Sequence, residues 1–95
     1  MEERKYEAML VFSVKDGEEK ATALADKFKE LIEKNGKIEN YDVWGKRKLA
    51  YLINDEPEGF YVLINYTAKP DFPVEFERNL KITEGVLRFL NIVEE

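Results

Sequence analysis

Three consecutive cations, Lys46, Arg47 and Lys48, are the residues of this sequence best placed to bind a charged ligand. Aromatic side chains flank them, with Trp44 before and Tyr51 after. Cations beside aromatic rings are typical of RNA-binding surfaces, where the cations meet phosphates. A merely solvated strand end explains the triplet about as well. Because side chains alternate along a strand, the three cations cannot all lie on one face.

The charge of the chain is unevenly distributed. The net charge is −5; residues 1–53 hold 11 basic and 11 acidic side chains, and residues 54–95 hold 4 and 9. The second half therefore supplies the whole net negative charge. A net negative charge disfavours binding to nucleic acid. Arg4-Lys5 and the triplet are the local clusters that phosphates could meet.

Several kinds of chemistry are excluded by composition. The sequence has no Cys and no His, which removes disulfides, thiolate metal sites and the commonest general base. The acidic pairs Glu2-Glu3, Glu18-Glu19 and Glu94-Glu95 fit solvated or dipole-capping roles at termini and a helix start. Gly45 and Gly59 do not lie between a strand and a helix, as a phosphate loop requires. We expect no catalytic residue, no metal and no cofactor.

Size and hydropathy predict one soluble domain spanning residues 1–95. The chain has 95 residues, 44% of them hydrophobic, with 6 Phe, 5 Tyr and 1 Trp, enough for a single core. The first residues lack a basic leader, so no signal peptide is expected. No apolar stretch approaches the roughly 20 residues that cross a bilayer. These features predict an intracellular protein.

Two helices are predicted. Asp16 and Glu19 have the spacing of a capping box at the start of the first helix. Asn35-Gly36 ends it, with the glycine in the left-handed conformation. The apolar positions recur at helical spacing: Ala21, Leu24, Ala25, Phe28, Leu31 and Ile32. Asp71 is expected to cap the second helix, which tolerates Pro73 in its first turn.

Four strands complete the pattern, at Tyr6–Val14, Ile38–Ile53, Phe60–Thr67 and Val86–Val93. The apolar parity of the second strand changes between Ile38 and Tyr41, which indicates a bulge. The element order predicts an α+β fold, the ferredoxin-like βαββαβ sandwich, a four-stranded antiparallel sheet with two helices on one face. Partners usually bind the uncovered face of this fold. Residues 58–65 match the base-stacking strand of RNA-recognition motifs only in part, so the alternate residues Phe60, Val62, Ile64 and Tyr66 are expected to pack under the helices.

The stretch Trp44-Gly45-Lys46-Arg47-Lys48-Leu49-Ala50-Tyr51 resembles the signature of the bacterial small-subunit ribosomal protein six family. Nearly the whole chain is similar, including Arg4-Lys5-Tyr6-Glu7, Gly59-Phe60-Tyr61, residues 77–82 and Gly85-Val86-Leu87-Arg88. Leu52 stands where the family usually has proline, so we expect the second strand to run straighter or to pair further toward its end. Many members carry an extension beyond the position of Glu95, and contacts from such a tail are not expected here.

The resemblance implies a non-enzymatic constituent of the small ribosomal subunit in the cytoplasm. It implies binding to the central domain of the small-subunit ribosomal RNA together with ribosomal protein eighteen, as a heterodimer. It also implies RNA or phosphate contacts for six cations: Arg4, Lys5, Lys46, Arg47, Lys48 and Arg88. Such contacts position a protein on folded RNA without reading bases. Trp44 and Tyr51 are expected to face the protein partner.

Two interpretations from other classes share this element order. An acylphosphatase-like hydrolase would need an anion loop with Arg after the first strand, but residues 13–18 supply acids there. A small regulatory or RNA-binding ferredoxin-like module outside the ribosome would need an apolar open face and a ligand loop, and only Gly17 is near. A small-molecule melting shift of a symmetric dimer would favour the regulatory module.

Overall fold

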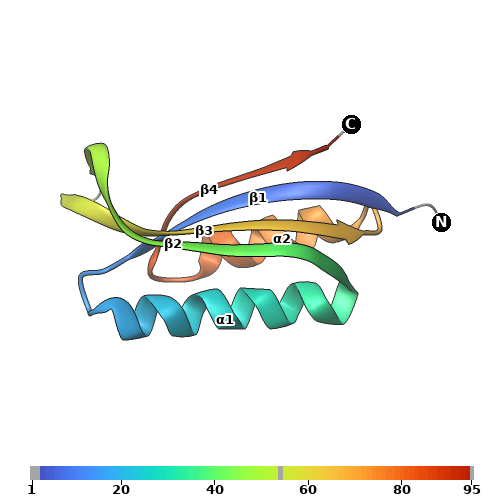
Figure 1. The fold of residues 1–95 in the computed structure, drawn as a ribbon, viewed down its shortest axis with the longest axis horizontal. Helices are drawn as coiled ribbons and strands as arrows, with labels where there is room; N and C mark the ends of the chain where they lie inside the picture. The colour runs from blue at the N-terminus through green and yellow to red at the C-terminus, as the bar shows by residue number, and fades with distance from the viewer. Residues whose placement is uncertain (1–2, 54, 95) are drawn as a thin grey trace.

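The structure, a computed structural model, describes residues 3–53 and 55–94. The elements are β1 (Arg4–Ser13), α1 (Glu18–Asn35), β2 (Gly36–Ile53), β3 (Glu56–Ala68), α2 (Phe72–Ile82) and β4 (Val86–Val93). The strands form one antiparallel sheet in the order β2-β3-β1-β4, and both helices cover the same face (Figure 1). This arrangement confirms the predicted ferredoxin-like sandwich. Glu2 and Glu95 of the predicted acidic pairs lie outside the described residues.

The core lies between the helices and one face of the sheet. Alternate residues of β1 and β3 pair directly across the ladder, among them Leu10 with Val62 and Ala8 with Ile64, and all four are fully buried. Directly opposed residues lie on the same face of the sheet, so every second residue of β1 and of β3 contributes to the core. Phe28 of α1 meets this layer. The predicted burial of one parity of β3 is confirmed: Phe60, Val62, Ile64 and Tyr66.

The long strand β2 departs from regular pairing with β3 at three points, the last of them between Lys48 and Ile53 at the turn end of the hairpin. Its register against β3 shifts between Ile38 and Asn40, which confirms the predicted bulge, and again between Val43 and Gly45. Gly45 has a φ of 81°, a value that favours glycine. Bulges increase local twist, and the β2–β3 hairpin bends toward the open face of the sheet (Figure 1).

Two predicted features of α1 are wrong. Asp16 does not cap the helix; Gly17 holds the N-cap position, and no side chain bonds to the free amides of the first turn. Asp16 instead pairs with Lys20 at 3.4 Å. At α2, Asp71 takes the predicted N-cap position, but its side chain makes no capping bond. Gly36 is not left-handed but extended, with a φ of −172°, and it begins β2. A Cβ at this position would overlap the Thr67 carbonyl of the neighbouring strand, which explains the glycine. Within the described part of the chain, neither helix has the length and hydropathy to cross a membrane.

Candidate nucleic-acid interface

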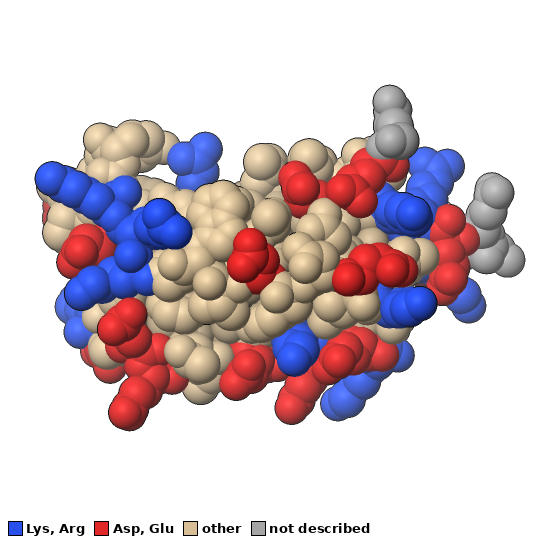
Figure 2. All heavy atoms as spheres, in the orientation of Figure 1, with Lys and Arg blue, Asp and Glu red and all other residues tan. Residues whose placement is uncertain are grey.

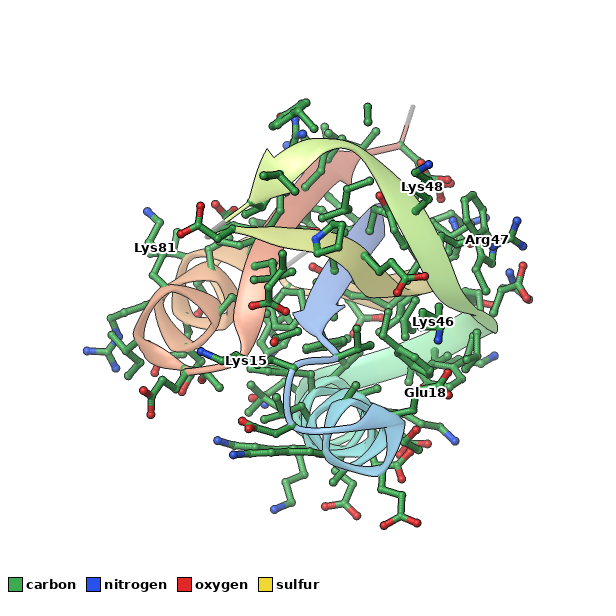
Figure 3. The ribbon with its side chains drawn as sticks, turned by 90° about the vertical axis from the view of Figure 1, so that its left-hand side faces the viewer. Lys15, Glu18, Lys46, Arg47, Lys48 and Lys81 are labelled. Carbon is green, nitrogen blue, oxygen red and sulfur yellow. The ribbon has the colours of Figure 1, made fainter. Side chains whose placement is uncertain are left out.

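The three cations of the triplet leave β2 on alternating sides. Lys46 lies opposite Phe60, a core residue, and therefore on the side of the helices. Arg47 lies opposite Gly59, which pairs with Ser13 on the open face. Figure 3 shows the three side chains diverging from β2, with Lys46 on the side of α1. The triplet thus presents positive charge around the strand edge.

Arg47 lies on an aromatic stack. Its guanidinium is 5.9 Å from the centroid of the Trp44 ring, and its Nε donates to the Trp44 carbonyl at 3.4 Å. The Trp44 ring stacks on Tyr61 with centroids 6.3 Å apart and planes inclined by 12°. The indole N–H donates to the Asp42 carboxylate at 2.9 Å. A guanidinium held against a fixed ring loses less side-chain entropy when it binds an anion.

Arg88 is held by the hairpin. It projects from β4 opposite Val11, on the open face, and its Nη1 donates to the Tyr51 hydroxyl at 2.7 Å. The bond joins β4 to the far end of β2, which are at opposite edges of the sheet. The curled hairpin makes this bond possible. The structure therefore brings Arg88 to the same end of the open face as Arg47.

Arg4 and Lys5 lie elsewhere. They begin β1, whereas the triplet is level with the end of that strand. Lys5 precedes Ser13 by eight residues, which is about 26 Å in an extended strand. In Figure 2, Lys and Arg gather at both ends of the molecule, with uncharged and acidic surface over most of the middle. The six predicted cations thus form two groups instead of one.

None of the six cations is neutralised by an ion pair with another described residue. The ion pairs of residues 3–53 and 55–94 are Lys20–Asp16 and Arg78–Glu75, both within or beside a helix. Lys48 lies opposite Glu58 on the ladder, which gives it a neighbouring charge without a direct ion pair. The charges of the two groups are therefore available to an external anion.

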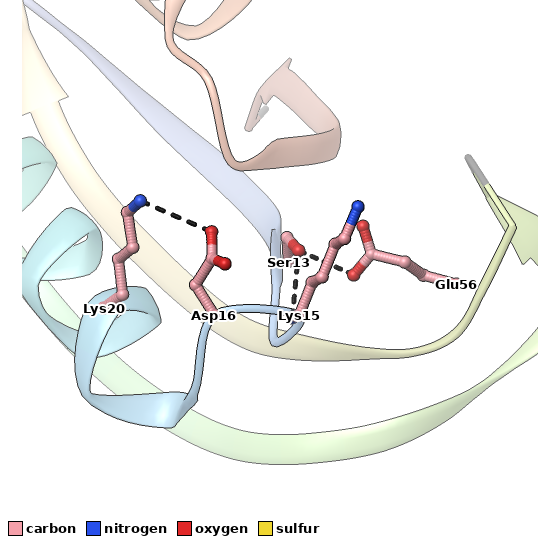
Figure 4. A network of polar contacts seen from close by, with 5 residues as sticks. All are labelled: Ser13, Lys15, Asp16, Lys20 and Glu56. Atoms are coloured by element: carbon pink, nitrogen blue, oxygen red, sulfur yellow. Dashed lines mark hydrogen bonds and ion pairs between the residues drawn. The ribbon is translucent and has the colours of Figure 1, made fainter.

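A polar network links the turn end of the β2–β3 hairpin to the end of β1. The Ser13 hydroxyl donates to the Glu56 carboxylate at 2.6 Å and accepts from the Lys15 amide at 3.1 Å (Figure 4). Glu56 begins β3 next to the hairpin turn, so this bond links the end of β1 to the second strand of the hairpin. The same loop contains the ion pair of Asp16 with Lys20. Acids at the start of α1 leave this loop unsuited to phosphate, as the sequence predicted.

The rest of the open face is apolar and acidic. Leu90 and Ile92 of β4 are 59% and 45% exposed. Beside them, the Asn65 amide donates to Glu94 at 3.0 Å and to Glu7 at 3.4 Å. The sequence prediction did not identify these residues as part of a surface. The sequence did contain a signal for this surface, because β4 has apolar side chains on both of its faces. An edge strand that is covered on one face needs apolar side chains on that face only.

Trp44 and Tyr51, predicted to face a protein partner, are 42% and 61% exposed. Each also contacts an arginine, as described above, so their accessible surface is shared with Arg47 and Arg88. The sequence placed both aromatic residues beside the triplet, but it did not indicate that Tyr51 would pair with Arg88 of β4.

Comparisons with known proteins agree with this fold. A sequence model of the family described as Ribosomal protein S6 matches residues 5–93. The small ribosomal subunit protein bS6 of Thermoanaerobacter pseudethanolicus is 51% identical over 90 residues, which cover 94% of this chain and 95% of that protein. The bS6 protein of Clostridium novyi is 47% identical over 93 residues, covering 97% and 98%.

A solved structure shows the same architecture. The crystal structure of 30S ribosomal protein S6 from Thermotoga maritima has a TM-score of 0.91 and 29% sequence identity, covering 98% of this chain and 89% of that one. The matches span nearly the full length of both the sequence and the fold. The chain therefore belongs to the ribosomal protein S6 family, the non-enzymatic structural components of the bacterial small ribosomal subunit, which functions in the cytoplasm.

Proposed function

We propose that this chain binds the central domain of the small-subunit ribosomal RNA together with ribosomal protein eighteen. In this proposal the hairpin group, Lys46, Arg47, Lys48 and Arg88, contacts phosphates at one end of the molecule. Arg4 and Lys5 contact a second RNA segment at the other end. The two groups then fix the orientation of the protein on the RNA, as phosphate contacts do without reading bases.

The observation that carries the proposal is the arrangement of Arg47 and Arg88. Both lie at the hairpin end of the open face, neither is paired with a described carboxylate, and each is held by an aromatic side chain. Two pre-oriented guanidinium groups suit the tetrahedral oxygens of a phosphate chain, because guanidinium can donate two parallel hydrogen bonds.

The protein partner is assigned to the remaining open face. Leu90 and Ile92 supply exposed apolar area, and the Glu7–Asn65–Glu94 group supplies negative charge. This surface suits a basic protein, which ribosomal protein eighteen is expected to be. Trp44 and Tyr51 border it and would contact both partners.

The net negative charge of the chain predicts that the RNA and ribosomal protein eighteen bind to it cooperatively. A free chain with a net charge of −5 is repelled by RNA beyond the screening length of about 8 Å. A basic partner offsets that charge and adds its own phosphate contacts, so RNA binding should be coupled to formation of the heterodimer by about 1 to 3 kcal/mol.

The test is a titration of central-domain RNA with this chain alone, with the partner alone and with both, at fixed ionic strength. We expect weak binding by the chain alone and an affinity roughly 5- to 150-fold higher in the presence of the partner. Tight and specific binding by the chain alone, unchanged by the partner, would contradict the proposal.

A further inference from the structure

The two edges of the sheet differ in their resistance to a further strand. β2 carries three breaks in its pairing register and the cationic triplet. Bulges and lysines on an edge strand oppose strand addition. β4, at the other edge, pairs with β1 in unbroken register from Arg88 to Val93. β4 is therefore the edge that can accept another strand.

The backbone groups that β4 offers can be identified from one hydrogen bond. The Glu94 amide donates to the Lys5 carbonyl at 2.8 Å, so these residues form a hydrogen-bonded pair of the antiparallel ladder. Hydrogen-bonded and non-hydrogen-bonded pairs alternate along such a ladder. The residues of the opposite parity therefore direct their amides and carbonyls away from β1, and no described strand lies beyond them: Phe89, Asn91 and Val93.

These outward groups are self-complementary. If two copies of β4 run antiparallel with Asn91 opposite its own copy, outward-facing residues meet only outward-facing residues. Phe89 then lies opposite Val93 on the side of the helices. All exposed ladder groups of these three residues find partners in a two-fold symmetric arrangement.

The side chains of the open face match in the same register. Leu90 lies opposite Ile92 of the other copy, which covers apolar surface exposed in the monomer. Arg88 lies opposite Glu94, and symmetry produces this opposite-charge pair twice. Directly opposed residues of opposite charge stabilise antiparallel strands. A shift by two residues would break both charge pairs, so the register is specified.

We propose that β4 pairs with β4 of a second copy of this chain, with Asn91 on the two-fold axis, to form one continuous eight-stranded sheet. Only residues 88–94 of each copy take part, so the interface is smaller than the roughly 1,200 Å² of stable complexes. The dimer is accordingly weak, with a dissociation constant of about 100 µM to 1 mM. The proposal concerns the free protein and does not depend on its RNA contacts.

Exchanging the charges of Arg88 and Glu94 tests the proposed pairing of β4 with its copy. Sedimentation equilibrium of the full chain between about 10 µM and 1 mM should show a monomer–dimer equilibrium. Arg88→Glu alone or Glu94→Arg alone places like charges opposite one another twice and should weaken the dimer about tenfold or more. The double variant R88E/E94R should restore the wild-type constant, which a general effect of charge would not do.

Backbone amides provide a second readout. On dilution, the amide resonances of Phe89, Asn91 and Val93 should shift, while that of Ile92, already bonded to β1, should change little. Val93→Pro removes an outward N–H that the monomer does not use, so the variant should stay folded and should no longer dimerise. A strict monomer at 1 mM, a double variant that fails to restore dimerisation, or dilution shifts on β2 instead of β4 would each overturn the proposal.

Discussion

On β3, Ile64 is fully buried under the helices, while its neighbour Leu63 is half-buried on the open face. The two faces of the sheet are thus built by adjacent residues of the same strands. The covered face is a continuous apolar layer stabilised by aromatic contacts, such as the pair of Phe28 and Phe76 at 6.0 Å. The open face combines apolar, acidic and cationic groups. One parity therefore supplies most of the buried core, and the other, apart from the buried Val11, is available for binding.

The strongest test of this division compares adjacent residues. Ile64→Ala should lower the free energy of unfolding by about 2 to 5 kcal/mol, because it leaves a cavity in a closed core. Leu63→Ala should cost less than half as much, because its side chain is already partly in water. Denaturant unfolding followed by circular dichroism measures both. Equal decreases would show that the open face also belongs to the core.

The next test separates binding from stability. Replacing Lys46, Arg47 and Lys48 together by Gln should weaken RNA assembly and reduce its log–log salt slope by about 0.7 to 0.9 for each phosphate that is no longer bound. The free energy of unfolding should change by less than about 0.5 kcal/mol per substitution. Lys15, Lys20 and Lys34, changed to Gln in the same way, are the matched control. If the control substitutions weaken binding as much, the RNA-facing side is assigned wrongly.

A third prediction concerns pH and the covered face. Burial raises the pKa of the Tyr66 hydroxyl well above its ordinary value; the hydrogen bond to Asn91 partly opposes this shift, and the charges of Tyr6 and Glu77 add to it. Burial also raises the pKa of Tyr41. A raised pKa means that the unfolded chain releases the proton first, so stability is complete below about pH 10 and falls as the pH rises further.

The expected decrease for Tyr66 approaches 1.4 kcal/mol per pH unit above about pH 10. Tyr66→Phe should flatten the alkaline profile of the free energy of unfolding, leaving the smaller dependence due to Tyr41. The variant also lacks the bond to Asn91, at 3.0 Å, so its stability at pH 7 serves as the baseline. An unchanged alkaline slope would show that this hydroxyl is not protected by the core.

A smaller effect is expected on the open face. Tyr51→Phe removes the acceptor that holds Arg88 and should weaken RNA assembly by about 0.5 to 1 kcal/mol, or roughly two- to fivefold. Arg88→Gln should have a larger effect, and the double variant no more than Arg88→Gln alone. Additive effects would indicate that Tyr51 binds RNA or the protein partner independently of Arg88.

The last prediction is that removing metal ions has no effect on stability. The chain has no Cys or His, and its helices and strands account for its apolar residues, so a chelator should leave the thermal unfolding curve unchanged. A clear fall in melting temperature after chelation would show a metal contribution that the composition does not indicate.

The sequence by itself determined the element order, the buried parity of β3, the bulge after Ile38 and the family. These features follow from short periods and from motifs of neighbouring residues, which are visible along the chain. Its errors were also local. The prediction that Asp16 caps α1 was wrong because Gly17 takes the N-cap position. The prediction that Gly36 is left-handed was wrong because this residue already pairs with β3, beside the Thr67 carbonyl.

Only the tertiary structure decided which functional residues meet. Tyr51 and Arg88 are 37 residues apart and are joined because the hairpin, whose pairing register shifts at three points, bends over the sheet. Arg4-Lys5 and the triplet are similar in composition, yet strand register places them at opposite ends. Register and bulge position depend on the summed pairing of whole strands, not on any local spacing. For that reason the sequence predicted which residues belong to the interface, but it did not predict which of them lie close together.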